Sequence, residues 1–149
     1  MSEQTQLRAF TALLSAATLL SRVVDQDLRD RAGITHAQFE ILARLSDGGI
    51  RMTDLARGLI LSRSGATYRI QQLVAAGYVA RADDPSDDRG VIASLTQAGH
   101  DVLAAATPGH RDLVQEVMFD VLTDSQLETM SAALEAVIAQ IEPSPHPSR

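Results

Sequence analysis

The chain of 149 residues contains no cysteine, no tryptophan and no lysine. Without cysteine it has no disulfide framework, no thiolate metal site, no cysteine nucleophile and no thiol redox switch. No uninterrupted apolar run approaches about 18 residues, the length of a membrane span. The first ten residues lack the basic and continuously apolar regions of a secretion signal. We therefore expect a cytoplasmic protein that does not enter a membrane.

The length fits one domain, large enough to bury a core without disulfides or a structural metal. Hydrophobic residues make up 45% and charged residues 21% of the chain, as in ordinary globular proteins. A disordered or fibrous chain is thereby excluded, and the sequence is expected to form a single folded domain over residues 1–149.

Positive charge is concentrated in one segment of an acidic chain. The formal net charge is −6, and all 13 basic residues are arginines. Between residues 51 and 82 five arginines face one acid, Asp54, so this segment carries +4 and the remainder −10. The five are Arg51, Arg57, Arg63, Arg69 and Arg81. Such an island would let a polyanion dock, although a chance cluster on a solvated face explains it equally well.

Apolar periodicity predicts helices over most of the chain. A long helix over residues 5–31 places one apolar stripe inward and ends at Gly33. Thr35 and Gln38 form a capping box that begins a second helix. A short third helix over about residues 52–59 follows, and Ser62 is placed to cap a fourth, which ends at Gly77.

The pattern then changes to strands and returns to helix. Residues 78–81 and 91–95 are predicted strands, and the polar residues 82–90 between them form the tip of a hairpin. Thr96 caps a fifth helix, which Pro108 should kink or split. Thr123 begins the last helix, and residues 142–149 are expected to be disordered.

These elements predict a mainly α fold with a small β-hairpin wing. A helix-turn-helix consists of two helices joined by a short turn, and here the second helix is amphipathic and flanked by arginines. The hairpin straight after it makes the unit a winged helix-turn-helix over residues 35–95. The helices over 5–31 and 96–141 carry more apolar surface than this unit covers. A second copy of the chain is the expected partner for that surface.

Several short motifs resemble the multiple-antibiotic-resistance regulator (MarR) family of bacterial repressors. They are Met52-Thr53-Asp54-Leu55-Ala56, the Leu-Ser-Arg-Ser run at 61–64, the residues from Leu73 to Arg81, and Asp84 to Val91 followed by Leu95-Thr96. The resemblance covers residues 35–100 and implies a homodimeric, DNA-binding repressor without a cofactor. It also implies a palindromic double-stranded operator and a small-molecule inducer, often an aromatic acid, that lowers DNA affinity.

The candidate DNA-binding residues lie on the fourth helix and the wing. They are Ser62, Arg63, Ser64, Thr67, Tyr68, Arg69, Gln71, Asp87 and Arg89. Gln71 suits an adenine edge and Thr67 a thymine methyl group, whereas the arginines suit phosphates. Two alternatives stay open: Tyr68 as a half-buried packing aromatic, and Arg69 in a salt bridge at the edge of the core. By the resemblance, Arg89 is the wing arginine and Asp87 the carboxylate that orients the wing.

The resemblance also implies a ligand cleft between the winged region and the dimerisation helices. Its candidate residues are Phe10, Leu14, His36, Phe39, Arg44 and Arg111. An arginine would hold a ligand carboxylate, and core packing is the alternative role of the two phenylalanines.

Other chemistry is not indicated. His36 and Glu40 share a helix face, but no His-x-x-x-His pair accompanies them, and the wing aspartates lack the spacing of a calcium loop. No nucleophile with its base, phosphate loop or dinucleotide motif is present, so neither a metal site nor an enzyme is expected. The alternatives to a DNA-binding regulator are a helical adaptor protein and a small-molecule carrier. Both leave the arginine island unexplained.

Overall fold

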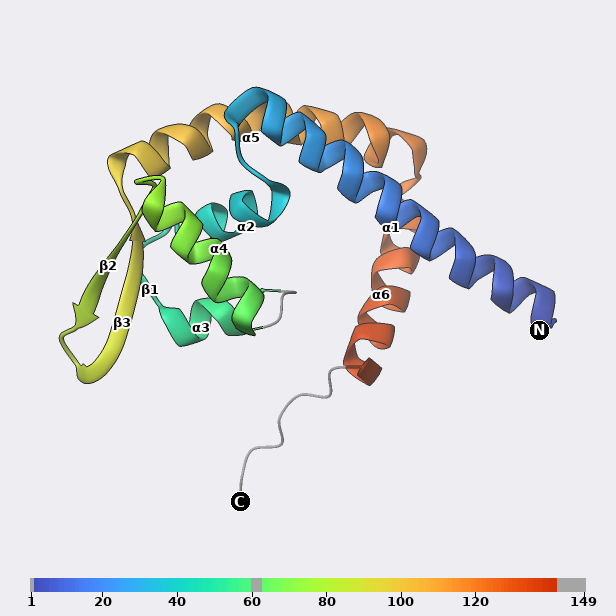
Figure 1. The fold of residues 1–149 in the computed structure, drawn as a ribbon. Coiled ribbons are helices and arrows are strands. Elements are labelled where there is room, and N and C mark those ends of the chain that lie inside the picture. The colour runs from blue at the N-terminus through green and yellow to red at the C-terminus, as the bar shows by residue number, and fades with distance from the viewer. Residues whose placement is uncertain (1, 60–62, 142–149) are drawn as a thin grey trace, which may run out of the picture. The chain divides into compact units, whose positions relative to one another are not determined.

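The computed structural model describes residues 2–59 and 63–141, apart from the side chains of Arg63 and Ser64. Six α-helices, one 3-10 turn and three strands occur in these ranges (Figure 1). The residues divide into two compact units, Met1–Arg111 and Asp112–Arg149. The expected cap at Ser62 and the expected tail at 142–149 lie outside the described residues.

The first two helices begin and end where their capping residues predict. α1 (Glu3–Ala32) ends at Gly33, whose φ of 67° places it in the left-handed region. α2 (His36–Arg44) begins with the complete capping box between Thr35 and Gln38. The His36 amide also donates to Asp25 Oδ1 at 2.9 Å, which ties the start of α2 to α1.

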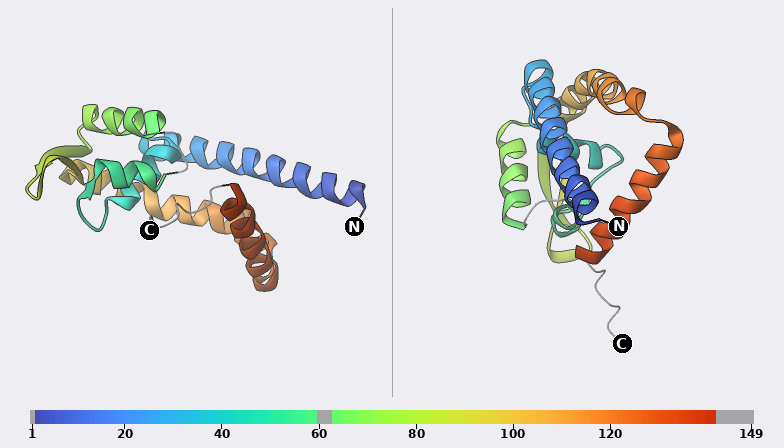
Figure 2. Two further views of the ribbon diagram at one scale, coloured as in Figure 1. Left: turned by 90° about the horizontal axis from the view of Figure 1, so that it is seen from below. Right: turned by 90° about the vertical axis from the view of Figure 1, so that its right-hand side faces the viewer.

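The helix-turn-helix and the wing follow. β1 (Ile50–Arg51) leads directly into α3 (Met52–Arg57), and α4 covers Arg63–Ala75. Gly77, at φ 79°, ends α4 and turns the chain into β2 (Val79–Asp84), which pairs with β3 (Asp87–Leu95). The sheet order is β1-β3-β2, with all neighbours antiparallel. The left view of Figure 2 shows β2 and β3 as a hairpin that extends beyond α4.

Two expectations about the sheet are corrected. β1 is an additional strand, because its two residues are too few to give a periodic signal. The hairpin strands also extend further than 78–81 and 91–95, so that only Pro85 and Ser86 remain between β2 and β3. The charged residues of the predicted loop therefore lie on strands.

The last helices differ from expectation at one proline. α5 (Gln97–Val117) begins at Thr96, whose Oγ1 accepts from the Gly99 amide, and runs through Pro108 without a break. The predicted split is wrong: Pro108 removes one backbone donor, and the rest of the helix continues around it. The 3-10 turn η1 (Phe119–Val121) separates α5 from α6 (Asp124–Ile141), which the Thr123–Gln126 box begins as predicted.

A compact aliphatic core lies in the first unit. Its fully buried large side chains come from α1, α2, α3, α4 and the segment before α2: Leu28, Ile34, Ile41, Leu42, Leu45, Leu55, Ile70 and Leu73. In contrast, no residue of 112–141 is buried within the chain. The expected buried stripe of α1 is therefore found only at Val24 and Leu28.

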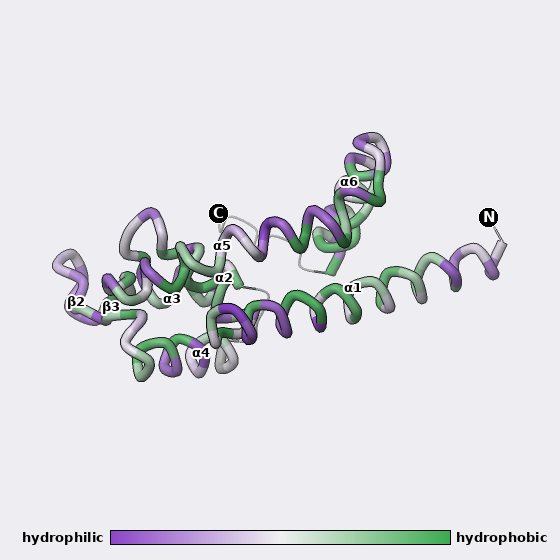
Figure 3. Tube along the Cα trace, turned by 90° about the horizontal axis from the view of Figure 1, so that it is seen from above, coloured by the Kyte–Doolittle hydropathy of each residue, from purple (hydrophilic) through white to green (hydrophobic). Residues whose placement is uncertain are grey.

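The middle of α1 is apolar, the green stretch along this helix in Figure 3, and many of its apolar side chains are exposed. Phe10 and Leu14 are more than half exposed, and the same holds for Leu7 and Leu19. An 18-residue window of α1 reaches a mean hydropathy of 1.4, so by length and composition the helix could cross a membrane. The sequence nevertheless contains no uninterrupted apolar run of this length, because serine, threonine and arginine interrupt it. The core helix of a soluble protein can reach the same mean hydropathy.

Candidate nucleic-acid interface

One face of α4 is buried and the other is open. Ala66, Ile70 and Leu73 are each inaccessible to solvent. Thr67, Tyr68 and Gln71 lie on the opposite side and are exposed, as the helical spacing predicts. A packing role for Tyr68 is wrong, since this side chain is 58% exposed and its hydroxyl accepts a hydrogen bond from Gln72 Nε2 at 3.1 Å.

The structure gives less information on the other DNA-binding candidates at α4. Arg69 is partly exposed and forms no ion pair within residues 2–59 and 63–141, so the proposed salt bridge at the core edge is absent there. Ser62 lies outside the described residues. Arg63 and Ser64 belong to the first turn of α4, with side chains outside the described part.

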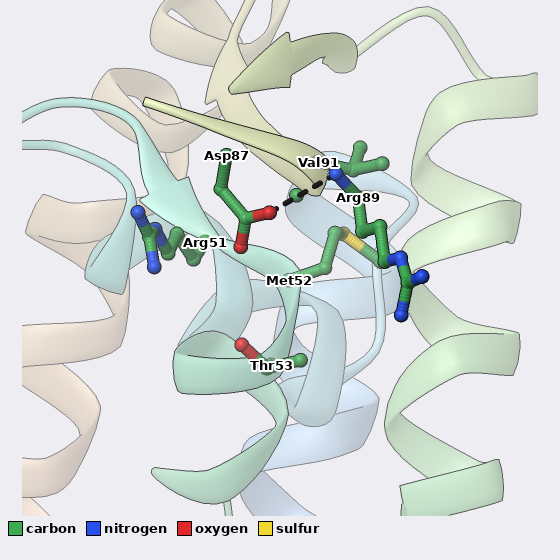
Figure 4. Close-up of a pocket in the computed structure, with 7 residues that line it drawn as sticks. Arg51, Met52, Thr53, Asp87, Arg89 and Val91 are labelled. Atoms are coloured by element: carbon green, nitrogen blue, oxygen red, sulfur yellow. Dashed lines mark hydrogen bonds between the residues drawn. The ribbon is translucent and has the colours of Figure 1, made fainter. Parts of the chain in front are cut away.

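The wing presents Arg89 beside a small pocket. The pocket has a volume of about 180 Å³ and lies between the start of α3 and β3 (Figure 4). Its lining residues are Arg51, Met52, Thr53, Asp87, Arg89, Gly90 and Val91. Asp87 Oδ1 accepts a hydrogen bond from the Arg89 amide at 3.1 Å, so this carboxylate holds the backbone from which the arginine extends. The two arginines leave the pocket in opposite directions in Figure 4.

Sequence reasoning missed Asp84, which ends β2 next to the turn of the wing. Its side chain is 4% exposed, and its Oδ2 lies 2.6 Å from Arg51 Nε. Oδ1 accepts hydrogen bonds from both the amide and the hydroxyl of Ser86. These two hydrogen bonds, reinforced by the Arg51 charge, lower the pKa of Asp84. A run of aspartates gave no sign that one of them would be buried.

These contacts reduce the positive charge that the arginine island can offer to a polyanion. Arg51 is committed to Asp84, and Arg57 lies 3.4 Å from Asp54 in an exposed pair. Arg69 and Arg81 form no ion pair within the described ranges, and neither does Arg89 on the wing. The positive charge available to a polyanion is therefore carried by Arg69 on α4, Arg81 on β2 and Arg89 on β3. It is not spread over all five arginines of residues 51–82.

The candidate ligand residues do not converge. His36 and Phe39 lie near His110, whose ring centroid is 5.8 Å from that of His36 and 4.5 Å from that of Phe39. Phe10 lies 15 residues before Asp25, the α1 residue that contacts His36, which corresponds to roughly 22 Å along a helix. Leu14, one turn further along α1, lines a separate open hollow on that helix.

The two candidate arginines, Arg44 and Arg111, have different surroundings. Arg44 Nη1 donates to the Gly58 carbonyl at 2.6 Å and so closes the end of α3. Arg111 is exposed and follows His110 directly. The ligand cleft stays a prediction, with His36 and Phe39 as the candidates that the structure brings together.

His110 is a titratable group at the junction of three helices. Its Nδ1 is buried, as is Oδ2 of Asp27 on α1, and neither has a hydrogen-bond partner within the described residues. Burial lowers the pKa of His110 and the nearby His36 lowers it further, whereas Asp27 and Glu40 act in the opposite direction. The described residues contain no group of three or more potential metal ligands.

Comparison with known proteins identifies the family. The model of the MarR family matches residues 32–90. The multiple antibiotic resistance protein MarR of Escherichia coli is 30% identical over 111 residues, which are 74% of this chain and 74% of that protein. The chain belongs to the MarR family. BadR of Rhodopseudomonas palustris, a transcriptional activatory protein, is 29% identical over 133 residues, or 86% of this chain and 75% of BadR.

Solved structures of MarR regulators share the whole fold. Sco3205, a MarR family transcriptional regulator from Streptomyces coelicolor solved in complex with DNA, superposes with a TM-score of 0.90 at 34% identity. The match covers 97% of this chain and 95% of Sco3205. AbsC from the same organism gives 0.87 at 28% identity, over 95% and 96% of the two chains. These regulators are not enzymes, and the chain is a mainly α winged-helix transcriptional regulator of the same family.

The environment of His110 predicts how the stability of the protein depends on pH. A histidine whose pKa is lower in the folded chain destabilises the fold as pH falls through the unfolded value of about 6.5, and the loss levels off below the folded pKa. His110→Asn should therefore lose less free energy of unfolding than the wild type between pH 7.5 and 5. Urea unfolding at the two values measures the difference.

His100→Asn is the matched control, because His100 is exposed on the same helix and should leave the wild-type loss unchanged. The lowered pKa values of Asp25 and Asp84 act below pH 4, outside this window. An equal loss in His110→Asn and in the wild type would show that His110 does not carry the effect.

Proposed function

We propose that this MarR regulator binds a specific double-stranded DNA sequence through α4 and the wing. The observation that carries the proposal is the burial of one face of α4, which turns Thr67, Tyr68 and Gln71 outward on the helix that leads into the wing. The structures of Sco3205 and of Escherichia coli MarR with DNA support it. A cytoplasmic location, where the DNA is, belongs to the same proposal.

Each exposed side chain has a chemical role in this proposal. Gln71 offers a bidentate amide to an adenine edge, and the methyl group of Thr67 can contact that of thymine, both in the major groove. Arg69 lies beside this face and contacts phosphate, which fixes register without reading sequence. Arg89, on the narrow hairpin, enters the electronegative minor groove or contacts its backbone.

Arg89→Ala and Gln71→Ala should weaken DNA binding in different ways. Arg89→Ala should reduce affinity for operator and scrambled duplexes alike and lower the salt slope by about one phosphate contact. Gln71→Ala should cost about 1–3 kcal/mol on the operator, with little change on scrambled DNA. Titrations of both duplexes at several salt concentrations separate the two effects.

Asp87→Ala tests the orienting role of that carboxylate. It should mimic Arg89→Ala, because the Arg89 amide loses its acceptor. Tighter binding by Asp87→Ala would show instead that the carboxylate only repels phosphate. If Arg89→Ala leaves both affinities and the salt slope unchanged, the wing does not contact DNA.

We further propose that the regulator is a homodimer built by its N- and C-terminal helices. α1 exposes Leu7, Phe10 and Leu14, and α6 exposes Val137, Ile138 and Ile141, more apolar surface than isolated side chains on a monomer account for. A second copy buries this surface with closed symmetry. A two-fold dimer carries two α4 helices and therefore matches a palindromic operator.

Charged substitutions on α6 should separate the protomers. Leu134→Glu combined with Ile138→Glu places two charges on the apolar stripe of that helix, and the variant should sediment as a monomer with weakened operator binding. Thr129→Glu combined with Gln140→Glu adds the same charge at exposed polar positions on the opposite face of α6 and should stay dimeric. A folded wild-type monomer at micromolar concentration would contradict the proposal.

Ligand control of DNA binding is proposed at the cluster of His36, Phe39 and His110. Two partly buried imidazoles and a buried phenyl ring lie together there, with Arg111 next in the chain, a composition that suits an aromatic carboxylate. Repression relieved by such a ligand is the mode of regulation that the family resemblance implies.

Thermal unfolding with added benzoate or naphthoate tests this site. The melting temperature should rise with the acids more than with neutral benzamide, and Arg111→Gln should remove the difference. Equal shifts for acids and amide, or no shift with any of them, would argue against an aromatic carboxylate at this cluster.

A further inference from the structure

A network of three polar side chains joins the wing to the start of the helix-turn-helix. Arg51 Nε lies 2.6 Å from Asp84 Oδ2, and Arg51 Nη2 donates to Ser86 Oγ at 2.9 Å. Ser86 in turn donates to Asp84 Oδ1 from its hydroxyl at 2.7 Å and from its amide at 2.9 Å. The guanidinium therefore holds both ends of the turn that joins β2 to β3.

The ion pair crosses the middle strand of the sheet. Arg51 belongs to β1 and Asp84 ends β2, and β3 lies between these two strands. The contact is possible because Gly90 lies at this point of β3: a Cβ there would come within 2.8 Å of the Asp84 Cβ and 3.1 Å of Oδ2. The absence of a side chain at Gly90 leaves room for the buried carboxylate.

Arg89 lies on an irregularity of β3 directly beside this crossing. Asp83 is opposite Val91, but the next residue, Asp84, is opposite Asp87. The three residues Asp88, Arg89 and Gly90 therefore have no partner on β2 and form a bulge. A bulge redirects the side chains that it carries, and its position here is set against Asp84.

We propose that the Arg51–Asp84 pair is a strap that fixes the Arg89-bearing bulge relative to α3, and that Arg51, Asp84 and Ser86 are positioning residues for DNA binding. The inference rests on the proposed role of Arg89 in DNA binding. An untethered two-stranded wing would hold Arg89 in many orientations, and each binding event would have to select one of them.

For the removal of Asp84, the proposal predicts a change in DNA affinity opposite to the one expected from charge alone. Removing an acid close to a polyanion strengthens binding when the acid only repels phosphate. Removing Asp84 should weaken binding, because Arg89 loses its fixed position. Asp83 provides the matched control: it is one residue away, exposed, and outside the network.

The first experiment compares DNA affinity of Asp84→Asn, Arg51→Met, the double variant and Asp83→Asn on the operator duplex. Asp84→Asn and Arg51→Met should each bind about five- to tenfold more weakly, and the double variant no more than about twofold more weakly than either, because both remove one interaction. Asp83→Asn should bind as tightly as the wild type or more tightly. Tighter binding by Asp84→Asn, or additive losses in the double variant, would overturn the strap.

The second experiment repeats Asp84→Asn in an Arg89→Ala background. If the strap acts through Arg89, Asp84→Asn should cause no further loss there, whereas general damage to the fold would still weaken binding. Ser86→Ala, which keeps the ion pair, should lose about two- to threefold and should likewise have no effect without Arg89. It provides the test if Asp84→Asn does not fold.

The experiments distinguish a failure of the proposed DNA contact of the wing from a failure of the strap. If Arg89→Ala binds as the wild type does, the proposed DNA contact of the wing is wrong. If Arg89→Ala weakens binding and Asp84→Asn weakens it further, the wing contacts DNA but the strap does not position it.

Discussion

Burial of one side of α4 is the constraint on which the interface depends. Ile70 and Leu73 are fully buried, and each contributes about 1.5–3 kcal/mol relative to an exposed position. Rotating α4 would expose these side chains, so the helix has one stable orientation over the core of α2 and α3. That orientation places Thr67 and Gln71 on the exposed face of the helix. Their exposure follows from the burial of the opposite face. The residues on the outward face can therefore differ without affecting how α4 packs on the core.

The wing depends on the same core through two junctions of different kinds. At its base, Thr96 Oγ1 donates to the Gly77 carbonyl, and Gly99 packs so closely on the Tyr78 carbonyl that any side chain there would overlap it. Near its tip, the Arg51–Asp84 pair joins β2 to β1 across β3. The first junction connects the wing with α5 and the second with α3. α5 therefore contacts the base of the wing at its start and the proposed ligand cluster at His110.

Local signals in the sequence predicted what local interactions determine. The capping boxes at Thr35 and Thr123, the glycines that end α1 and α4, and the existence of the hairpin are all short-range features, and the structure confirms them. The burial of Asp84 could not be predicted, because its partner Arg51 is 33 residues away and is brought near by strand pairing. Pro108 does not split α5, because a proline inside a helix removes only one backbone donor; a kink at this residue stays a prediction. The apolar stripe predicted for α1 is present in the sequence, but the chain buries it only at Val24 and Leu28.

Directed cleavage of DNA tests most directly that α4 and the wing face the duplex. The chain has no cysteine, so Thr67→Cys, Asp88→Cys and Gln6→Cys each give one attachment point for an iron–EDTA reagent. The account predicts major-groove cleavage from position 67 and minor-groove cleavage from position 88, a few base pairs apart in each half of the operator, with none from position 6 at the far end of α1. Cleavage from positions 67 and 88 no stronger than from position 6 would contradict it.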